Sequence, residues 1–82
     1  MQLGPAQYEG EPTGAGIRAV RFENRLWEVW SYWDGRHWSA GTWTYAEALE
    51  RWRSHPPEAR IRPEDQSRRK VMRWREVLHD AA

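Results

Sequence analysis

The segment GTWTYAEALERWRSHPP, residues 41 to 57, contains the end of a predicted strand and the whole of a predicted helix. Thr44 is followed three residues later by Glu47, and this capping-box spacing begins a helix. An apolar face then follows at helical spacing, formed by Ala48, Leu49 and Trp52. The two prolines at 56 and 57 end the pattern, because proline has no N–H to continue the helical hydrogen bonds. We therefore expect one short amphipathic helix here.

Three strands are predicted ahead of this helix. The first is IRAVRF (17–22), and the second is LWEVWSYW (26–33), which is rich in aromatic residues. DGR (34–36) supplies a hairpin turn, because Asp-Gly tolerates positive φ angles, and HWSAGTW (37–43) follows as the third strand. These spacings predict an α+β fold of the order β-β-β-α, a three-stranded antiparallel sheet packed on one helix.

Two segments lie outside this unit of residues 17–55. Residues 1–16 are rich in glycine and proline and poor in apolar side chains, so we expect a flexible tail. After a proline-containing linker at 56–62, residues 63–80 are predicted to form a C-terminal amphipathic helix that Pro63 opens. Its apolar stripe consists of Val71, Trp74 and Leu78.

The composition excludes several classes of protein. The chain has no cysteine, and its three histidines are scattered without ligand spacing, so we expect no disulfide, no metal and no cofactor. No apolar run has the length of a membrane span, and the first ten residues lack the features of a signal peptide, which favours a cytoplasmic protein without membrane contact. The net charge is +1, from 13 basic and 12 acidic residues, which is less basic than a dedicated duplex binder.

The seven tryptophans raise the question of which ones are buried. Side chains alternate between the faces of a strand, so the residues can be sorted into two sets. The set with the larger apolar volume is expected under the helix: Val20, Phe22, Trp27, Val29, Trp38 and Ala40. The other face is expected to carry Arg18, Arg21, Glu28, Trp30, Tyr32, His37 and Ser39. Three alternatives stay open: the C-terminal helix covers Trp30 and Tyr32, these two residues form a contact surface, or the strands have another register.

The fragments IRAVR, WEV, GTW and TYAEAL, found between residues 17 and 52, resemble the DNA-binding domain of plant ethylene-response factors and phage homing endonucleases. That family places three strands on one helix and reads DNA with the exposed sheet face. The resemblance implies that Arg18 and Arg21 match DNA-contacting arginines and that Thr42 matches a phosphate-contacting threonine. Trp30, Tyr32, His37 and Ser39 occupy other reading positions with different residue types.

The sequence therefore favours a non-catalytic binding module, since no phosphate-loop or nucleophile-elbow pattern is present. Arginines interleaved with aromatic residues suit nucleic acid, including stacked single-stranded bases. The same composition is typical of protein interfaces, so the alternative is a stoichiometric inhibitor or adaptor acting on a host protein complex, as phage anti-CRISPR proteins do, with homodimerisation as a variant. The expected contact residues are Arg18, Arg21, Trp30, Tyr32, His37, Ser39 and Thr42, with a second basic group of Arg68, Arg69, Lys70, Arg73 and Arg75 on the C-terminal helix.

Overall fold

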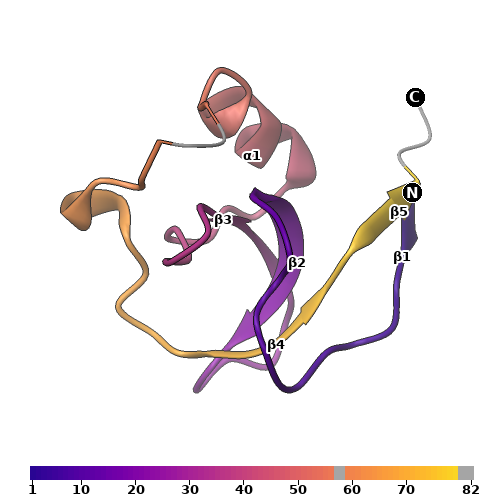
Figure 1. Cartoon of the computed structure of the whole chain (residues 1–82). Coiled ribbons are helices and arrows are strands. Elements are labelled where there is room, and N and C mark those ends of the chain that lie inside the picture. The colour runs from indigo at the N-terminus through magenta and orange to yellow at the C-terminus, as the bar shows by residue number, and fades with distance from the viewer. Residues whose placement is uncertain (57–58, 80–82) are drawn as a thin grey trace.

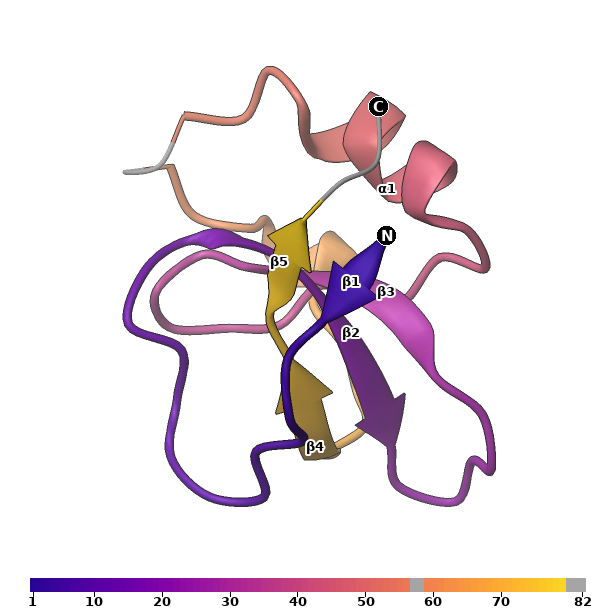
Figure 2. The same cartoon turned by 90° about the vertical axis from the view of Figure 1, so that its right-hand side faces the viewer.

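The computed structural model describes residues 1–56 and 59–79, and its architecture is α+β (Figure 1). In chain order the elements are β1 (Gln2–Leu3), β2 (Gly16–Phe22), β3 (Val29–Trp33), α1 (Tyr45–Trp52), the short 3-10 helix η1 (Pro63–Asp65), β4 (Val71–Arg75) and β5 (Val77–His79). One antiparallel sheet has the strand order β3-β2-β4, and β1 pairs with β5 in a separate two-stranded ribbon (Figure 2). The described residues contain no helix of the length and apolarity that crossing a bilayer requires.

The predicted hairpin of the first two strands is confirmed, although its second strand is shorter than expected. Residues 17–22 lie in β2, and Val20 pairs with Val29 while Ala19 pairs with Trp30. Asn24 has a φ of 61°, in the left-handed region that asparagine tolerates, and it turns the chain after β2. Because residues 26 and 27 still belong to this connection, strand pairing begins only at Val29.

The third strand of the sheet is β4, so the predicted third strand at 37–43 is wrong. That segment makes only isolated bridges, which join Trp38 to Trp33, Ser39 to Gln66, and Thr42 to Trp30. Its backbone hydrogen bonds are divided between β3 and the end of η1, where the carbonyl of Asp65 accepts from the N–H of Ala40. At Gly41 an added Cβ would lie 2.6 Å from Val29 Cγ2, so only glycine allows this close crossing.

The predicted C-terminal helix is also wrong, since residues 71–75 and 77–79 are strands. Val71 pairs with Phe22 and Trp74 pairs with Val20, with a register irregularity between these pairs. A bulge of this kind adds one residue to β4, so two apolar residues three positions apart meet the same face of β2. A spacing of three residues also places side chains on one face of a helix, so the spacing alone fits both a helix and a strand. The segment forms a strand because it pairs with the free edge of β2.

The helix α1 begins as predicted. Thr44 adopts an extended conformation, and its side-chain oxygen accepts a hydrogen bond of 3.1 Å from the N–H of Glu47. Tyr45, Ala48 and Trp52 share one face of the helix, which packs on β3 and β2. Both views place the helix over one part of the sheet, with β4 on the far side (Figures 1 and 2).

The predicted orientation of the sheet is wrong, because Trp30 and Tyr32 lie under the helix. Tyr32 stacks on Trp52 with ring centroids 5.1 Å apart, and Trp30 meets Tyr45 edge-on at 4.9 Å. The buried cluster on this side consists of Tyr32, Ala48, Trp52 and Ile61. Apolar volume does not distinguish the two faces of the sheet, because the opposite face is buried as well, as the low exposure of Val20, Phe22 and Trp33 shows.

Part of residues 1–16, expected as a flexible tail, runs beside the C-terminal strands. The backbones of Gln7 and Trp74 exchange two hydrogen bonds, of 2.8 and 3.0 Å, and the N–H of Gly4 donates to Glu76. The buried guanidinium of Arg18 makes two 3.1 Å hydrogen bonds to the Glu76 carboxylate. Segments from both ends of the described chain thus complete the structure around β2.

Candidate functional site

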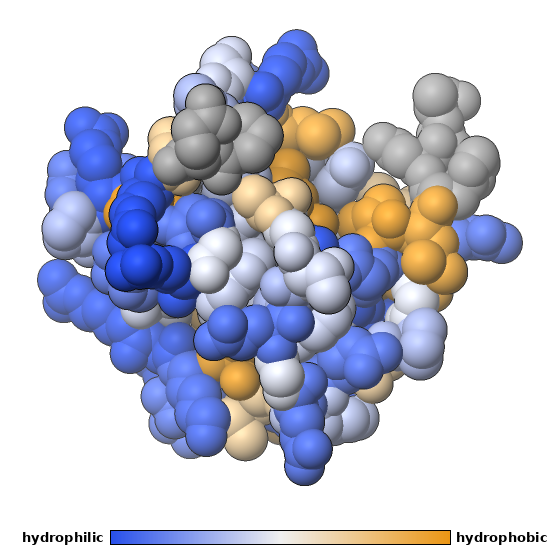
Figure 3. Space-filling view, in the orientation of Figure 1, coloured by the Kyte–Doolittle hydropathy of each residue, from blue (hydrophilic) through white to orange (hydrophobic). Residues whose placement is uncertain are grey.

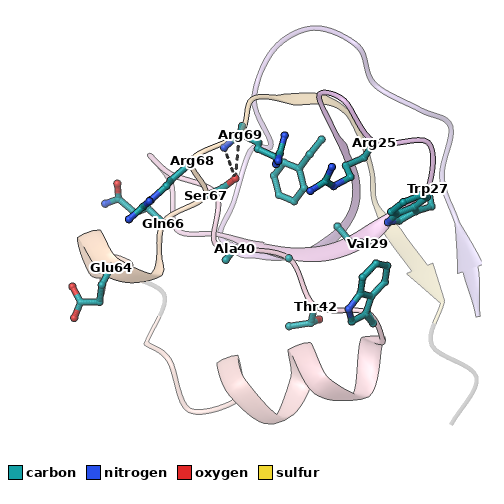
Figure 4. A pocket seen from close by; sticks show the side chains of 13 residues that line it. Arg25, Trp27, Val29, Ala40, Thr42, Glu64, Gln66, Ser67, Arg68 and Arg69 are labelled. Atoms are coloured by element: carbon teal, nitrogen blue, oxygen red, sulfur yellow. Dashed lines mark hydrogen bonds between the residues drawn. The ribbon is translucent and has the colours of Figure 1, made fainter.

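An open groove of about 470 Å³ lies where the β2–β3 connection faces the segment after η1 (Figure 4). Arg25 and Trp27 come from the connection, and Gln66 and Arg68 come from the opposite wall. Its remaining lining consists of Phe22, Val29, Ala40, Gly41, Thr42, Trp43, Glu64, Ser67 and Arg69. The groove thus joins an apolar floor to basic walls.

Two tryptophans form an exposed aromatic edge of this groove. Trp43 is 69 % exposed and Trp27 is 48 % exposed, and their ring centroids are 6.0 Å apart with a tilt of 33°. At this distance the two rings already contact each other, so a third ring fits on their outer faces and not between them. Large apolar side chains gathered at an exposed hollow are typical of a contact surface.

The positive charge of the groove is available to a ligand. Within the described residues no carboxylate pairs with the guanidinium of Arg25, Arg68 or Arg69. The acid in the wall, Glu64, lies 3.7 Å from Arg62, which is not a lining residue. The groove therefore has an excess of positive charge beside its aromatic edge.

Hydrogen bonds hold the Ser67–Arg69 wall and the backbone around Trp43 in place. The Ser67 hydroxyl accepts from the N–H of Arg69 and donates to its carbonyl, which closes a tight turn that presents Arg68 (Figure 4). Thr42 exchanges two backbone hydrogen bonds with Trp30, and its hydroxyl donates to the carbonyl of Thr44. Trp43 stands between these two anchored threonines, so its backbone is fixed although its ring is exposed.

The structure does not bring the predicted contact residues together on one surface. Arg18 is buried against Glu76, and Arg21 donates to the carbonyl of Arg25. These two arginines lie on opposite faces of β2, because residues three apart in a strand point in opposite directions. As described above, Trp30 and Tyr32 belong to the core under α1.

Among the other predicted residues, Thr42, Arg68 and Arg69 line the groove. Ser39 is fully buried, where its hydroxyl accepts from the N–H of Tyr32. His37 and Lys70 are exposed and line a neighbouring cleft.

The second basic group is divided, because it does not lie on a helix. Arg75 and Arg73 belong to β4 and face Glu28, with nitrogen-to-oxygen distances of 3.1 and 3.8 Å. They are therefore neutralised within the fold, whereas Arg68, Arg69 and Lys70 lie in the turn before β4.

Arg25 and Trp43 are site residues that the sequence patterns do not predict, and Trp27 was expected in the core. Strand alternation says nothing about Trp27, because it lies in a bend before β3 begins. Its neighbour Leu26 is 90 % exposed, which marks the same departure from strand geometry. For Trp43 the available indication was its place directly before the N-cap Thr44, because a residue at this position lies outside the helix.

The described part of the chain contains no group of three or more histidine or acidic side chains arranged to hold a metal ion. No known protein family, curated protein or solved structure matches this chain.

Proposed function

We propose that this protein is a small binding module that holds single-stranded nucleic acid in the groove of Trp27, Trp43 and the three arginines. The observation that carries the proposal is the exposed tryptophan pair beside arginines that have no carboxylate partner among the described residues. Aromatic side chains stack on bases of any sequence, and arginines contact the phosphates between them. In this arrangement Trp43 supplies the stacking platform, and Arg25, Arg68 and Arg69 supply the phosphate contacts.

The shape of the site favours a single strand over a duplex. The bases of a duplex are already stacked on each other, so an aromatic edge reaches them only after the duplex is opened. The described structure places its one α-helix of eight residues against the sheet, with Ala48 and Trp52 buried. That helix is therefore committed to the core and does not project as a reading element for a major groove.

The test is fluorescence anisotropy of a labelled oligothymidylate and of a labelled hairpin duplex, each at about 50 and about 200 mM salt. We expect the single strand to bind more tightly than the duplex. Arg69→Ala should reduce the slope of log affinity against log salt by about 0.7, the value for one phosphate contact with a single strand. Trp43→Ala should lower the affinity by about 1–3 kcal/mol and leave the slope unchanged, because stacking releases no counterions.

Two matched variants serve as controls. Arg53 and Tyr8 are exposed and do not line the groove, so Arg53→Ala and Tyr8→Ala should change neither affinity nor slope. A protein that gives no anisotropy change with any probe at the lower salt concentration would contradict the proposal.

A protein partner is the second candidate, and Leu26 is the observation that favours it. This side chain is 90 % exposed next to Trp27, and an aliphatic group beside an indole suits a protein interface better than a nucleic acid. Leu26→Ala should leave oligonucleotide affinity unchanged and weaken a protein complex. Affinity capture after nuclease treatment, with the wild type and Leu26→Ala side by side, distinguishes the two candidates.

A further inference from the structure

A second cleft of about 340 Å³ adjoins the groove. Gln66, Ser67 and Arg69 line both hollows, so only the segment that carries these residues separates them. The other lining residues of the second cleft are Glu11, Trp33, Arg36, His37, Trp38, Lys70 and Val71. The turn at Ser67–Arg69 is therefore a ridge with a hollow on each side.

The second cleft repeats the composition of the groove. Trp38 is half-buried and contacts the buried Trp33, with ring centroids 5.0 Å apart and a tilt of 50°. The cations there are Arg36, Arg69 and Lys70, and none of their side chains has an ion pair within the described residues. Each hollow thus combines a tryptophan pair with basic groups that no carboxylate of the described residues pairs with.

The acidic residue nearest to Arg36 in the sequence is occupied elsewhere. Asp34 accepts hydrogen bonds from the backbone N–H groups of Arg36 and His37, of 2.7 and 2.6 Å, and from the N–H of Ile61 at 2.8 Å. These bonds fix the turn that carries Arg36 and His37 at the cleft. Among the described residues, Glu11 is the one acid that lines the second cleft.

We infer that one single-stranded nucleic acid crosses both hollows, with its phosphates over the ridge at Ser67–Arg69. This inference rests on the proposed function and extends it. Hydrophilic side chains cover the side of the molecule along which the 63–70 segment runs, whereas apolar ones gather near β1 and β5 (Figure 3). A flexible strand can follow a path over a ridge, whereas the stiffness of a duplex opposes such a bend.

The experiment measures the affinity of oligothymidylates of increasing length, from about 4 to about 16 nucleotides, by anisotropy. The wild type is compared with a variant that carries both Arg36→Ala and Lys70→Ala. Both residues are exposed, so the variant should keep the fold, which circular dichroism and thermal unfolding verify. Arg53→Ala is the control for loss of positive charge away from both hollows.

We expect the affinity of the wild type to rise with length until both hollows are occupied. The double variant should bind the shortest probe as the wild type does. With the longest probe, its slope of log affinity against log salt should be smaller by about 1.4, since two phosphate contacts disappear. If all lengths bind equally, or if the variant weakens short and long probes alike, the second cleft is not on the path and the inference is wrong, although the proposed function stands. If no probe binds at any length, the proposed function fails and the inference fails with it.

Discussion

The core under α1 and the groove beside it both depend on tryptophan, yet the two regions use it differently. In the core, Trp52 stacks on Tyr32 at 5.1 Å with an angle of only 14°, and it is 7 % exposed. In the groove, Trp43 and Trp27 touch only at a tilt and remain 69 % and 48 % exposed. Burial of an indole stabilises the fold, whereas an exposed indole leaves its apolar area for a ligand. A count of tryptophans therefore reveals neither role until each ring has been located.

The largest loss of stability is expected for a substitution in the core. Trp52→Ala should lower the free energy of unfolding by about 3–5 kcal/mol, because it leaves a cavity beside Tyr32. The indole N–H has no hydrogen-bond partner among the described residues, so Trp52→Phe should cost much less. Urea unfolding of both variants measures the difference. If Trp43→Ala were equally damaging, the distinction between the two regions would be wrong.

Asp34 connects the core to the 34–37 turn, so its removal should have the next largest effect. Burial acts to raise the pKa of Asp34, but the N–H groups of His37, Ile61 and Arg36 outweigh it and hold the pKa below its usual value. Asp34→Asn should cost about 2 kcal/mol, because an amide has one acceptor oxygen for these donors.

The same carboxylate makes stability depend on pH. Because its folded-state pKa lies below the unfolded value, its contribution is complete above about pH 4 and is lost as the pH falls through the folded-state pKa. Urea unfolding between neutral and acidic pH should show this loss in the wild type. A variant Asp34→Asn with the same acid dependence would show that other carboxylates are responsible.

Removal of the helix cap should lower the stability by a smaller amount. Thr44→Ala removes the acceptor for the N–H of Glu47 and should cost about 1 kcal/mol. Thr44→Ser keeps the hydroxyl and should restore most of this stability. Thermal unfolding of the pair sharpens the comparison, because Thr44 lies between the groove residue Trp43 and the core-facing helix.

Trp43→Ala should have the smallest effect on folding, within about 0.5 kcal/mol, because the ring is 69 % exposed. Its effect on oligonucleotide binding should nevertheless be the largest of these variants. Measuring the free energy of unfolding and the oligonucleotide affinity on one preparation tests directly whether the groove and the core are separate. Loss of stability together with loss of binding would mean that the groove is part of the core.

Local patterns in the sequence predicted some elements well and others poorly. The β2 strand and the start of α1 follow from residues that are close in the chain, namely a β-rich run and the Thr44–Glu47 pair. The strand β4 could not be predicted in this way, because the partner that makes it a strand is β2, and a bulge gives its apolar residues helical spacing. Arg68 and Arg69 are therefore predicted on a helix, although their prediction as basic contact residues does not depend on it.

The candidate site was predicted only in part. Arg68 and Arg69 are predicted from their charge and Thr42 from the family resemblance, and all three residues line the groove. Trp27 is assigned to the core because strand alternation is extended to residues ahead of Val29, where β3 begins, and Arg25 lies in the same β2–β3 connection. Where a chain leaves a strand, the direction of a side chain depends on local backbone angles such as the φ of Asn24, which composition does not reveal.

The position of β4 has a consequence for how quickly the chain reaches its native state. The hydrogen bonds from Arg18 to Glu76 and from Arg75 to Gly4 close loops of 58 and 71 positions in the sequence. Closing long loops costs chain entropy before any contact repays it, so domains with many distant pairings fold more slowly than helical bundles. During synthesis, one edge of β2 stays unpaired until residue 75 has left the ribosome. An unpaired strand edge invites association with other chains, so nascent or truncated forms that lack β4 should be the aggregation-prone species of this protein.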